Sequence, residues 1–274
     1  MLRRYTNLFS PEVRGLENLP ATGPVLVVGN HSGLFYMPDA WVVSLAIVDR
    51  RGSEQPAYAL GYDLLFGIPG VGRYLRRIGA IPARGGVALE ALGQGALVLD
   101  YPGGDLEACR PWTARNRIDF AGRTGFVRLA LQAGVPVVPV VSQGGHDIVI
   151  VVTRGERLAR VLGLHRLRIK VFPVMIGPPM GLATILNPPL PLPAAITVEF
   201  LPALDWTADG PDAAGDPGVV ASRFREITGV MQEALDRLHL EHPHPVARGV
   251  SQLVRRTLTR GGPPVQPEEF SFQS

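Results

Sequence analysis

Residues 25–40 read VLVVGNHSGLFYMPDA, and this stretch decides what fold we expect. Its first four residues are apolar and mostly β-branched and are followed by Gly29, which predicts a short strand buried on both faces. From Asp39 onwards apolar residues recur at helical spacing, and aspartate is a favoured helix N-cap. The stretch therefore predicts a strand, a loop that carries His31, and a helix capped by Asp39.

The same alternation of short strands and helices continues along the chain. Further strands are predicted at residues 57–60, 79–82, 96–101 and 135–141, and further helices at 73–77, 87–92, 126–133, 223–240 and 247–260. Strands that alternate with helices are typical of an α/β sheet whose strands run mostly parallel. We therefore expect a single domain with a mostly parallel central sheet flanked by helices.

Composition limits the number of domains and the kinds of partner. The chain has 274 residues, 46% of them hydrophobic, which is enough for one buried core and too little for several ordinary domains. Its 32 glycines and 26 prolines argue against a helical bundle or coiled coil. A net charge of +3 is too small to indicate nucleic acid binding. Most of the positive charge is arginine, which suits phosphate esters and anionic headgroups.

The sequence favours a reducing compartment. Cys109 is the only cysteine, so no internal disulfide can form, and no secretion signal opens the sequence, so we expect a cytoplasmic protein. Residues 171–198 contain no charged residue, but their prolines exclude one continuous transmembrane helix. This stretch lines an acyl channel, presses against a bilayer or is buried as ordinary strands and loops.

The helix expected at residues 247–260 is amphipathic. One side carries four apolar residues and a threonine, namely Val250, Leu253, Val254, Leu258 and Thr257. Such a helix either lies on an anionic membrane surface or packs on the domain with its arginines in water. We expect residues 1–240 to form the main domain and residues 241–274 to form this basic helix and a polar tail.

Three stretches together form a recognisable pattern. They are residues 25–40, YPGGDLEACRPW at residues 101–112, and RTGFVRLALQAGVPVVPVVSQGGHD at residues 123–147. The combination resembles the superfamily of glycerolipid and lysophospholipid acyltransferases, which includes the 1-acylglycerol-3-phosphate acyltransferases. It is most similar to the branch with a diacylglycerol acyltransferase-like Pro-Gly-Gly motif. The resemblance implies a glycerol-3-phosphate acyltransferase-like fold and the transfer of a fatty acyl group from acyl-coenzyme A to a lipid hydroxyl.

The family's catalytic motif is a histidine followed, after four intervening residues, by an aspartate. In this chain seven residues separate His31 from Asp39, and Tyr36 stands at the family's spacing. The resemblance implies His31 as the general base and, if the loop is enlarged, Asp39 as the carboxylate that orients it. The alternatives are a structural histidine and an aspartate that only caps the helix.

The residue types suit this chemistry independently of the resemblance. A neutral imidazole, with a pKa of about 6.5, can take the proton of a hydroxyl that attacks a thioester. A carboxylate on the other ring nitrogen fixes the tautomer and stabilises the imidazolium. Cys109 has no neighbouring base, and no Gly-x-Ser-x-Gly motif occurs, so direct transfer without an acyl-enzyme is expected.

Substrate-binding candidates lie downstream of this pair. Backbone amides of Gly103 and Gly104, in the Pro-Gly-Gly turn, are candidates to hold the oxyanion of the tetrahedral intermediate. The resemblance implies Glu107 as the glutamate of the branch and Arg110 as the arginine of the phosphate-binding motif.

Two further arginines, Arg84 and Arg123, are candidates to bind a glycerol phosphate or the phosphates of coenzyme A. We expect acyl-coenzyme A as co-substrate, with acyl carrier protein as the less favoured donor, and no other cofactor. His146 and Asp147 lack the further ligands that a metal needs, so no metal site is expected.

The expected acceptor is a lysophospholipid or a mono- or diacylglycerol, and the expected location is the inner face of the membrane, as a peripheral protein. Two alternative functions stay open. His31 could activate water in an acyl-coenzyme A thioesterase, or the chain could be a non-catalytic lipid-binding protein of the same fold.

Overall fold

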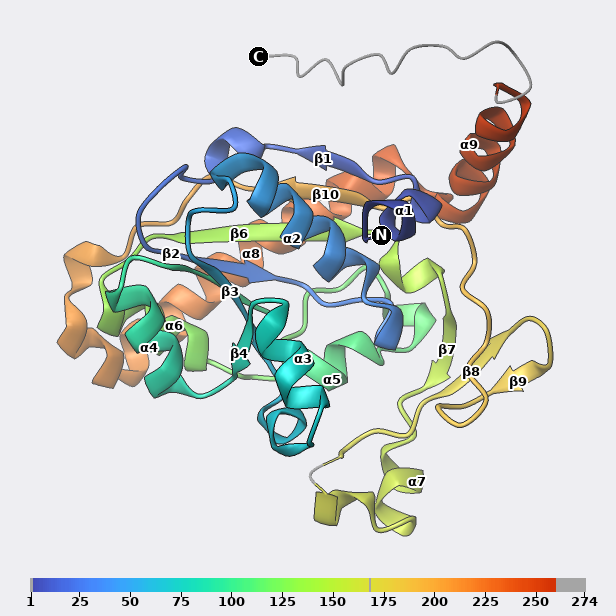
Figure 1. Cartoon of the computed structure of the whole chain (residues 1–274). Helices are drawn as coiled ribbons and strands as arrows, with labels where there is room; N and C mark the ends of the chain where they lie inside the picture. Colours follow the sequence, from blue (N-terminus) through green and yellow to red (C-terminus); the bar gives the residue numbers. More distant parts are fainter. Residues whose placement is uncertain (1, 168, 260–274) are drawn as a thin grey trace.

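A seven-stranded sheet forms the centre of the computed structural model, which describes residues 2–167 and 169–259 (Figure 1). The strand order is β1-β10-β6-β2-β5-β3-β4. The strands are β1 (Glu12–Arg14), β2 (Val25–Gly29), β3 (Ala57–Gly61), β4 (Ala80–Pro82), β5 (Leu97–Asp100), β6 (Val137–Gln143) and β10 (Thr197–Phe200). The five adjacent strands β6, β2, β5, β3 and β4 run parallel to one another. Strand β10 is antiparallel to β6 and parallel to β1. The expected mostly parallel sheet is confirmed.

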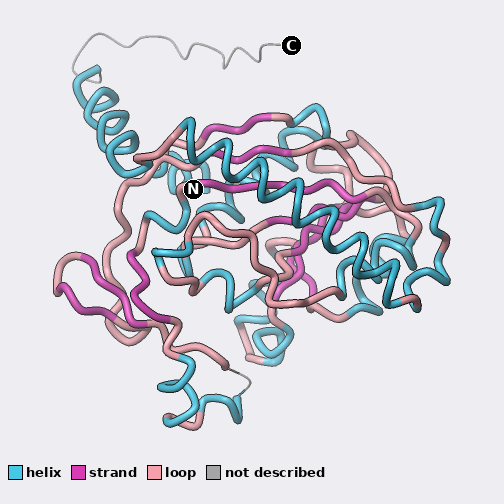
Figure 2. The backbone as a smooth tube through the Cα atoms, turned by 180° about the vertical axis from the view of Figure 1, so that it is seen from behind, coloured by secondary structure: helices cyan, strands magenta, loops and turns pink. Residues whose placement is uncertain are grey.

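Helices cover both faces of this sheet. They are α1 (Leu2–Thr6), α2 (Pro38–Arg51), α3 (Val71–Arg77), α4 (Gly85–Gly93), α5 (Gly104–Ala108), α6 (Gly125–Ala133), α7 (Glu156–Val161), α8 (Pro217–Glu241) and α9 (Pro245–Thr259). In Figure 1, α2 crosses the near face. Figure 2, from behind, shows the long helix α8 crossing the strands on the other face.

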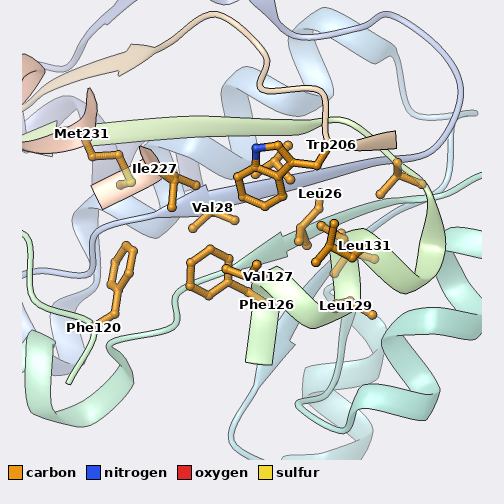
Figure 3. Close-up of a cluster of buried hydrophobic side chains, with 14 of the residues drawn as sticks. Leu26, Val28, Phe120, Phe126, Val127, Leu129, Leu131, Trp206, Ile227 and Met231 are labelled. Carbon is orange, nitrogen blue, oxygen red and sulfur yellow. The ribbon is translucent and has the colours of Figure 1, made fainter. Parts of the chain in front are cut away.

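Strand β2 divides the core into two halves. Its side chains alternate between the faces, so Leu26 and Val28 join one buried cluster while Val25 and Val27 join the other. Figure 3 shows Leu26 and Val28 beside Phe126 of α6 and Met231 of α8. Because both faces are covered, this strand is apolar throughout, as the sequence analysis predicted.

The start of α2 differs from the expectation. The helix begins at Pro38 with Met37 as its N-cap residue, and no side chain makes a capping hydrogen bond. Asp39 is the second helical residue, and its carboxylate faces the preceding loop instead. The prediction that Asp39 caps the helix was therefore wrong.

The uncharged stretch from residue 171 contributes to a second, smaller sheet. This sheet has the order β7 (Ile150–Thr153), β8 (Val174–Gly177) and β9 (Gly181–Ala183), and all its pairs are antiparallel. Within the described residues, no helix is long and apolar enough to cross a membrane. The expectation that this stretch is not a transmembrane helix is confirmed.

The carboxyl ends of five parallel strands lie at one edge of the main sheet, which we call the carboxyl edge. Open α/β sheets bind their ligands outside such an edge. β10 is antiparallel to β6, so the beginning of β10 lies at the carboxyl edge. α9 starts at the same edge, because the amide of Ala195, two residues before β10, donates to the carbonyl of Pro245 at 2.9 Å. The division into residues 1–240 and 241–274 stays a prediction, and residues 260–274 lie outside the described part.

Candidate active site

His31 and Asp39 meet at the carboxyl edge. His31 follows β2, and its Nδ1 lies 3.0 Å from Oδ2 of Asp39. The same carboxylate oxygen accepts the backbone N–H of Ser32 at 2.7 Å. Asp39 is fully buried, while the His31 side chain is 13% exposed. The geometry is that of an imidazole oriented through Nδ1 by a buried carboxylate.

The loop between the two residues absorbs the additional spacing. Leu34–Tyr36 form a single 3-10 turn between the two residues. Gly33 precedes the turn with φ +76°, and a Cβ there would lie 2.5 Å from Cδ of Pro38. Two hydrogen bonds hold the last residue of the turn: Tyr5 Oη donates to the Tyr36 carbonyl, and Tyr36 Oη donates to the carbonyl of Pro189. An enlarged loop thus returns the aspartate to the histidine.

The electrostatic surroundings favour protonation of His31. Burial lowers its pKa, but the adjacent Asp39 carboxylate, through its charge and hydrogen bond, and the charge of Glu107 outweigh burial and raise it. The imidazole also lies against Tyr101, with ring centroids 4.8 Å apart. Burial raises the pKa of the Tyr101 phenol well above its usual value, so this ring stays neutral.

Glu107, on α5, connects the turn after β5 to the histidine. Its Oε2 accepts the backbone N–H of His31 at 3.1 Å, and its Oε1 accepts from Nη2 of Arg110 at 3.0 Å. Both side chains of this ion pair are buried. Burial raises the pKa of Glu107 to about 7, against the opposing effect of the Arg110 charge. Glu107 therefore contacts the backbone of the candidate base directly.

The Pro-Gly-Gly turn makes room for this glutamate. A Cβ at position 103 would lie 2.2 Å from Oε2 of Glu107, so a residue with a side chain at Gly103 would displace the carboxylate. Gly104 has φ +50°, and its amide donates to the Tyr101 carbonyl at 3.0 Å. Arg123 supports the same turn, since its Nη1 donates to the carbonyls of Pro102 and Gly103.

Arg84 lies apart from this network. It follows β4, which is three strands from β2, or roughly 14 Å at the usual strand spacing. Its side chain is 67% exposed and lies 3.6 Å from a carboxylate oxygen of Asp63. Of the predicted site residues, His31, Asp39, Glu107 and Arg110 form one contact network, Arg123 and the glycines form the adjoining turn, and Arg84 stands alone. Their roles in catalysis and binding stay predictions.

Three side chains near the pair received no site role from the sequence: Ser32, Tyr101 and His146. His146 follows β6, the strand beside β2, and its Nε2 is buried without a hydrogen-bond partner among the described residues. Burial, and the nearby charge of Arg110, hold the pKa of His146 well below its usual value. His146 and Tyr101 each follow a parallel strand in the sequence. This position could have predicted that they lie near His31, but only if the order of the strands in the sheet had been known. No group of three metal-binding side chains occurs in the described part of the chain.

The chain matches a family model and is similar to several known proteins. A family model described as Acyltransferase matches residues 10–143. A protein of Bos taurus named "DGAT1/2-independent enzyme synthesizing storage lipids" is 30% identical over 233 residues, which cover 82% of this chain and 67% of that protein. An "Uncharacterized protein" of Mycobacterium leprae is 31% identical over 235 residues, 85% of this chain. The chain spans only 61% of the length of this last relative.

One solved structure is also similar. The 1-acyl-sn-glycerophosphate acyltransferase PlsC of Thermotoga maritima matches with a TM-score of 0.49 and 19% identity. The match covers 86% of this chain and 75% of that one.

Proposed function

The chain belongs to the acyltransferase family, and on this premise we propose that it moves a fatty acyl group from acyl-coenzyme A to the hydroxyl of a lysophospholipid or a mono- or diacylglycerol. One observation carries the proposal: the contact of 3.0 Å between His31 and the buried Asp39 at the carboxyl edge. A base oriented in this way is what acyl transfer to a weakly acidic hydroxyl requires.

In the proposed reaction Nε2 of His31 takes the proton of the acceptor hydroxyl as its oxygen attacks the thioester carbonyl. Asp39 holds the proton on Nδ1 and stabilises the imidazolium. When the tetrahedral intermediate collapses, the C–S bond breaks and the coenzyme A sulfur takes the proton from the imidazolium. The ester and free coenzyme A are the products, and no other cofactor takes part.

Direct transfer is supported by the state of the only cysteine. Cys109 is buried, and burial raises the pKa of its thiol to about 12. Because the thiolate is the nucleophilic form, this cysteine is unsuited to carry an acyl group.

Glu107 acts in this proposal as a positioning residue. It fixes the backbone of His31 through the hydrogen bond at 3.1 Å, and its negative charge favours the imidazolium. Arg110 holds Glu107 in turn. We assign the oxyanion to the amide of Gly103 in the Pro-Gly-Gly turn, because the amide of Gly104 donates to the Tyr101 carbonyl. We assign the phosphates of coenzyme A or of the acceptor to Arg84 and Arg123.

We further propose that the protein works as a peripheral protein at the cytoplasmic face of the membrane, where such acceptors reside. The apolar side of α9 supports this, because four of its members are exposed: Val250, Leu253, Val254 and Leu258. An amphipathic helix of this kind binds at the interface of a bilayer.

The test is release of coenzyme A from a long-chain acyl-coenzyme A, with and without lysophosphatidic acid or monoacylglycerol, and product identification by mass spectrometry. We expect release that depends on the acceptor and falls about 10²- to 10⁴-fold in His31→Ala. Release independent of any acceptor would indicate a thioesterase. Lipid binding that is equal in both proteins, without release, would indicate a non-catalytic lipid-binding protein.

A further inference from the structure

The small sheet has one covered face and one open face. Met175 on β8 pairs with Ala183 on β9, and both side chains are buried in the core. The next pair, Ile176 and Leu182, points to the opposite face, and Leu182 is 66% exposed. The water-facing side of an antiparallel sheet ordinarily carries polar residues. Here the open side is apolar.

The loop after β9 extends this open face. The amide and the hydroxyl of Thr184 donate to Oδ1 of Asn187 at 2.9 and 2.8 Å, and Nδ2 of Asn187 donates to the Leu182 carbonyl. The loop thus satisfies these polar groups internally, while Leu186 at its tip is 82% exposed. Internal satisfaction of polar groups is what a segment needs to leave water for an apolar phase.

Exposed positive charges lie on the connection between β7 and β8, which precedes this apolar surface in the chain. Residues 171–198 contain no charged residue, whereas α7, the following turn and Lys170 present exposed cations. These cations are Arg157, Arg160, Arg166 and Lys170, and none forms an ion pair with another described residue. Apolar side chains beside cations match an anionic leaflet. A second copy of this chain would bring the same cations together, which disfavours a symmetric dimer through this surface.

The surface also adjoins the candidate active site. The Tyr36 hydroxyl, from the loop between His31 and Asp39, donates to the carbonyl of Pro189, which precedes the exposed Leu190. Strand β7 follows β6 directly beyond the carboxyl edge, and Figure 1 shows the small sheet projecting from that side of the molecule. Phe35, in the same loop as Tyr36, is exposed as well.

We propose that a hairpin surface, formed by Ile176, Met180, Leu182, Leu186 and Leu190, enters an anionic lipid leaflet and turns the carboxyl edge towards the bilayer. All five side chains are exposed. In this orientation a lipid acceptor reaches His31 directly from the leaflet, and this last step rests on the proposed acyl transfer. Binding of the surface to lipid does not itself require turnover.

Flotation with vesicles tests the proposal. Vesicles of phosphatidylcholine, with or without phosphatidylglycerol, are mixed with the native protein and with Leu182→Asn/Leu186→Asn. We expect the partition into anionic vesicles to fall by about tenfold or more in this variant, since binding scales with buried apolar area. The matched control is Val48→Asn/Leu89→Asn, which changes two exposed apolar residues on α2 and α4 and leaves flotation unchanged.

Charge provides a second arm. Arg157→Gln/Arg160→Gln is expected to weaken binding to anionic vesicles by roughly fivefold per charge and to leave binding to neutral vesicles unaltered. His31→Ala is expected to float like the native protein, so a failure of acyl transfer leaves this result standing.

Two outcomes would overturn the proposal. One is flotation that is unchanged in Leu182→Asn/Leu186→Asn. The other is a native dimer that becomes a monomer in this variant, as measured by size-exclusion chromatography, while binding to vesicles persists. This result would identify the surface as a contact between two copies of the chain. Thermal unfolding checks that the variant folds, and Leu186→Asn alone, at the exposed loop tip, repeats the test with a smaller change.

Discussion

His31 combines a buried partner on Nδ1 with a ring that solvent still reaches. Its pKa is raised because Asp39 and Glu107 outweigh burial. The proposed base must be neutral, so activity is lost as the pH falls through this raised pKa. The acidic limb of kcat/KM should therefore lie above about pH 6.5, the ordinary value for histidine.

Asp39→Asn tests the origin of this shift. Without the carboxylate, the largest influence that raises the His31 pKa is gone while burial still lowers it. The acidic limb should move to lower pH, and kcat should fall about 10²- to 10⁴-fold because the tautomer is no longer fixed. A pH–rate profile checks both effects. A limb that stays in place would show that Asp39 does not set the state of the base.

Gly103→Ala tests the place of Glu107. Its backbone, at φ −66°, accepts alanine, but the new Cβ would meet the Glu107 carboxylate at 2.2 Å. We expect a loss of about 1–3 kcal/mol in the free energy of unfolding and a fall of roughly tenfold in kcat/KM. Gly86→Ala is the control, since its Cβ meets nothing within 4 Å. If urea unfolding and turnover assays give the same free energy of unfolding and the same kcat/KM for both variants, then Gly103 does not make room for Glu107 as we infer.

At the residue level, His31 and Asp39 were selected through the resemblance carried by residues 25–40, 101–112 and 123–147, because a histidine at the end of a strand is by itself more often structural. The contact of Glu107 with the His31 backbone could not be predicted. It depends on the packing of the turn after β5 against the loop after β2, two segments distant in the chain.

The loop between β2 and α2 is the element that adapts the family's spacing. Tyr36→Phe removes the hydrogen bond to the Pro189 carbonyl without changing the ring. We expect the free energy of unfolding to fall by about 1 kcal/mol, the usual net value of one such bond. Tyr74→Phe, at an exposed position of α3, serves as the control. If Tyr36→Phe and the native protein have the same free energy of unfolding in urea, the hydrogen bond from Tyr36 to Pro189 does not stabilise the loop.

Most elements were predictable because their signals are periodic. The apolar runs of β2, β5 and β6 and the amphipathic pattern of α8 and α9 appear in the structure close to the expected residues. The small sheet was not predicted as strands. Its segment is rich in proline and apolar on both sides, so it lacks the alternation that indicates a half-buried strand.

In the described part of the molecule, the hairpin surface and the apolar side of α9 are two of the exposed apolar surfaces near the carboxyl edge. If both contact one leaflet, their contributions to binding should add in free energy, because they are separate sites. We expect Leu253→Asn/Leu258→Asn on α9 to weaken vesicle flotation, and the combination with Leu182→Asn/Leu186→Asn to multiply the two losses. An α9 variant that floats like the native protein would remove α9 from the membrane contact.

The central claim is that His31 is the base of an acyl transfer. The most direct measurement is the rate at which acylated glycerolipid forms from acyl-coenzyme A and acceptor in His31→Ala, beside His165→Ala as the control. His165 is an exposed histidine of the turn after α7. The account predicts a loss of about 10²- to 10⁴-fold in His31→Ala and a native rate in His165→Ala. Undiminished ester formation by His31→Ala would contradict it.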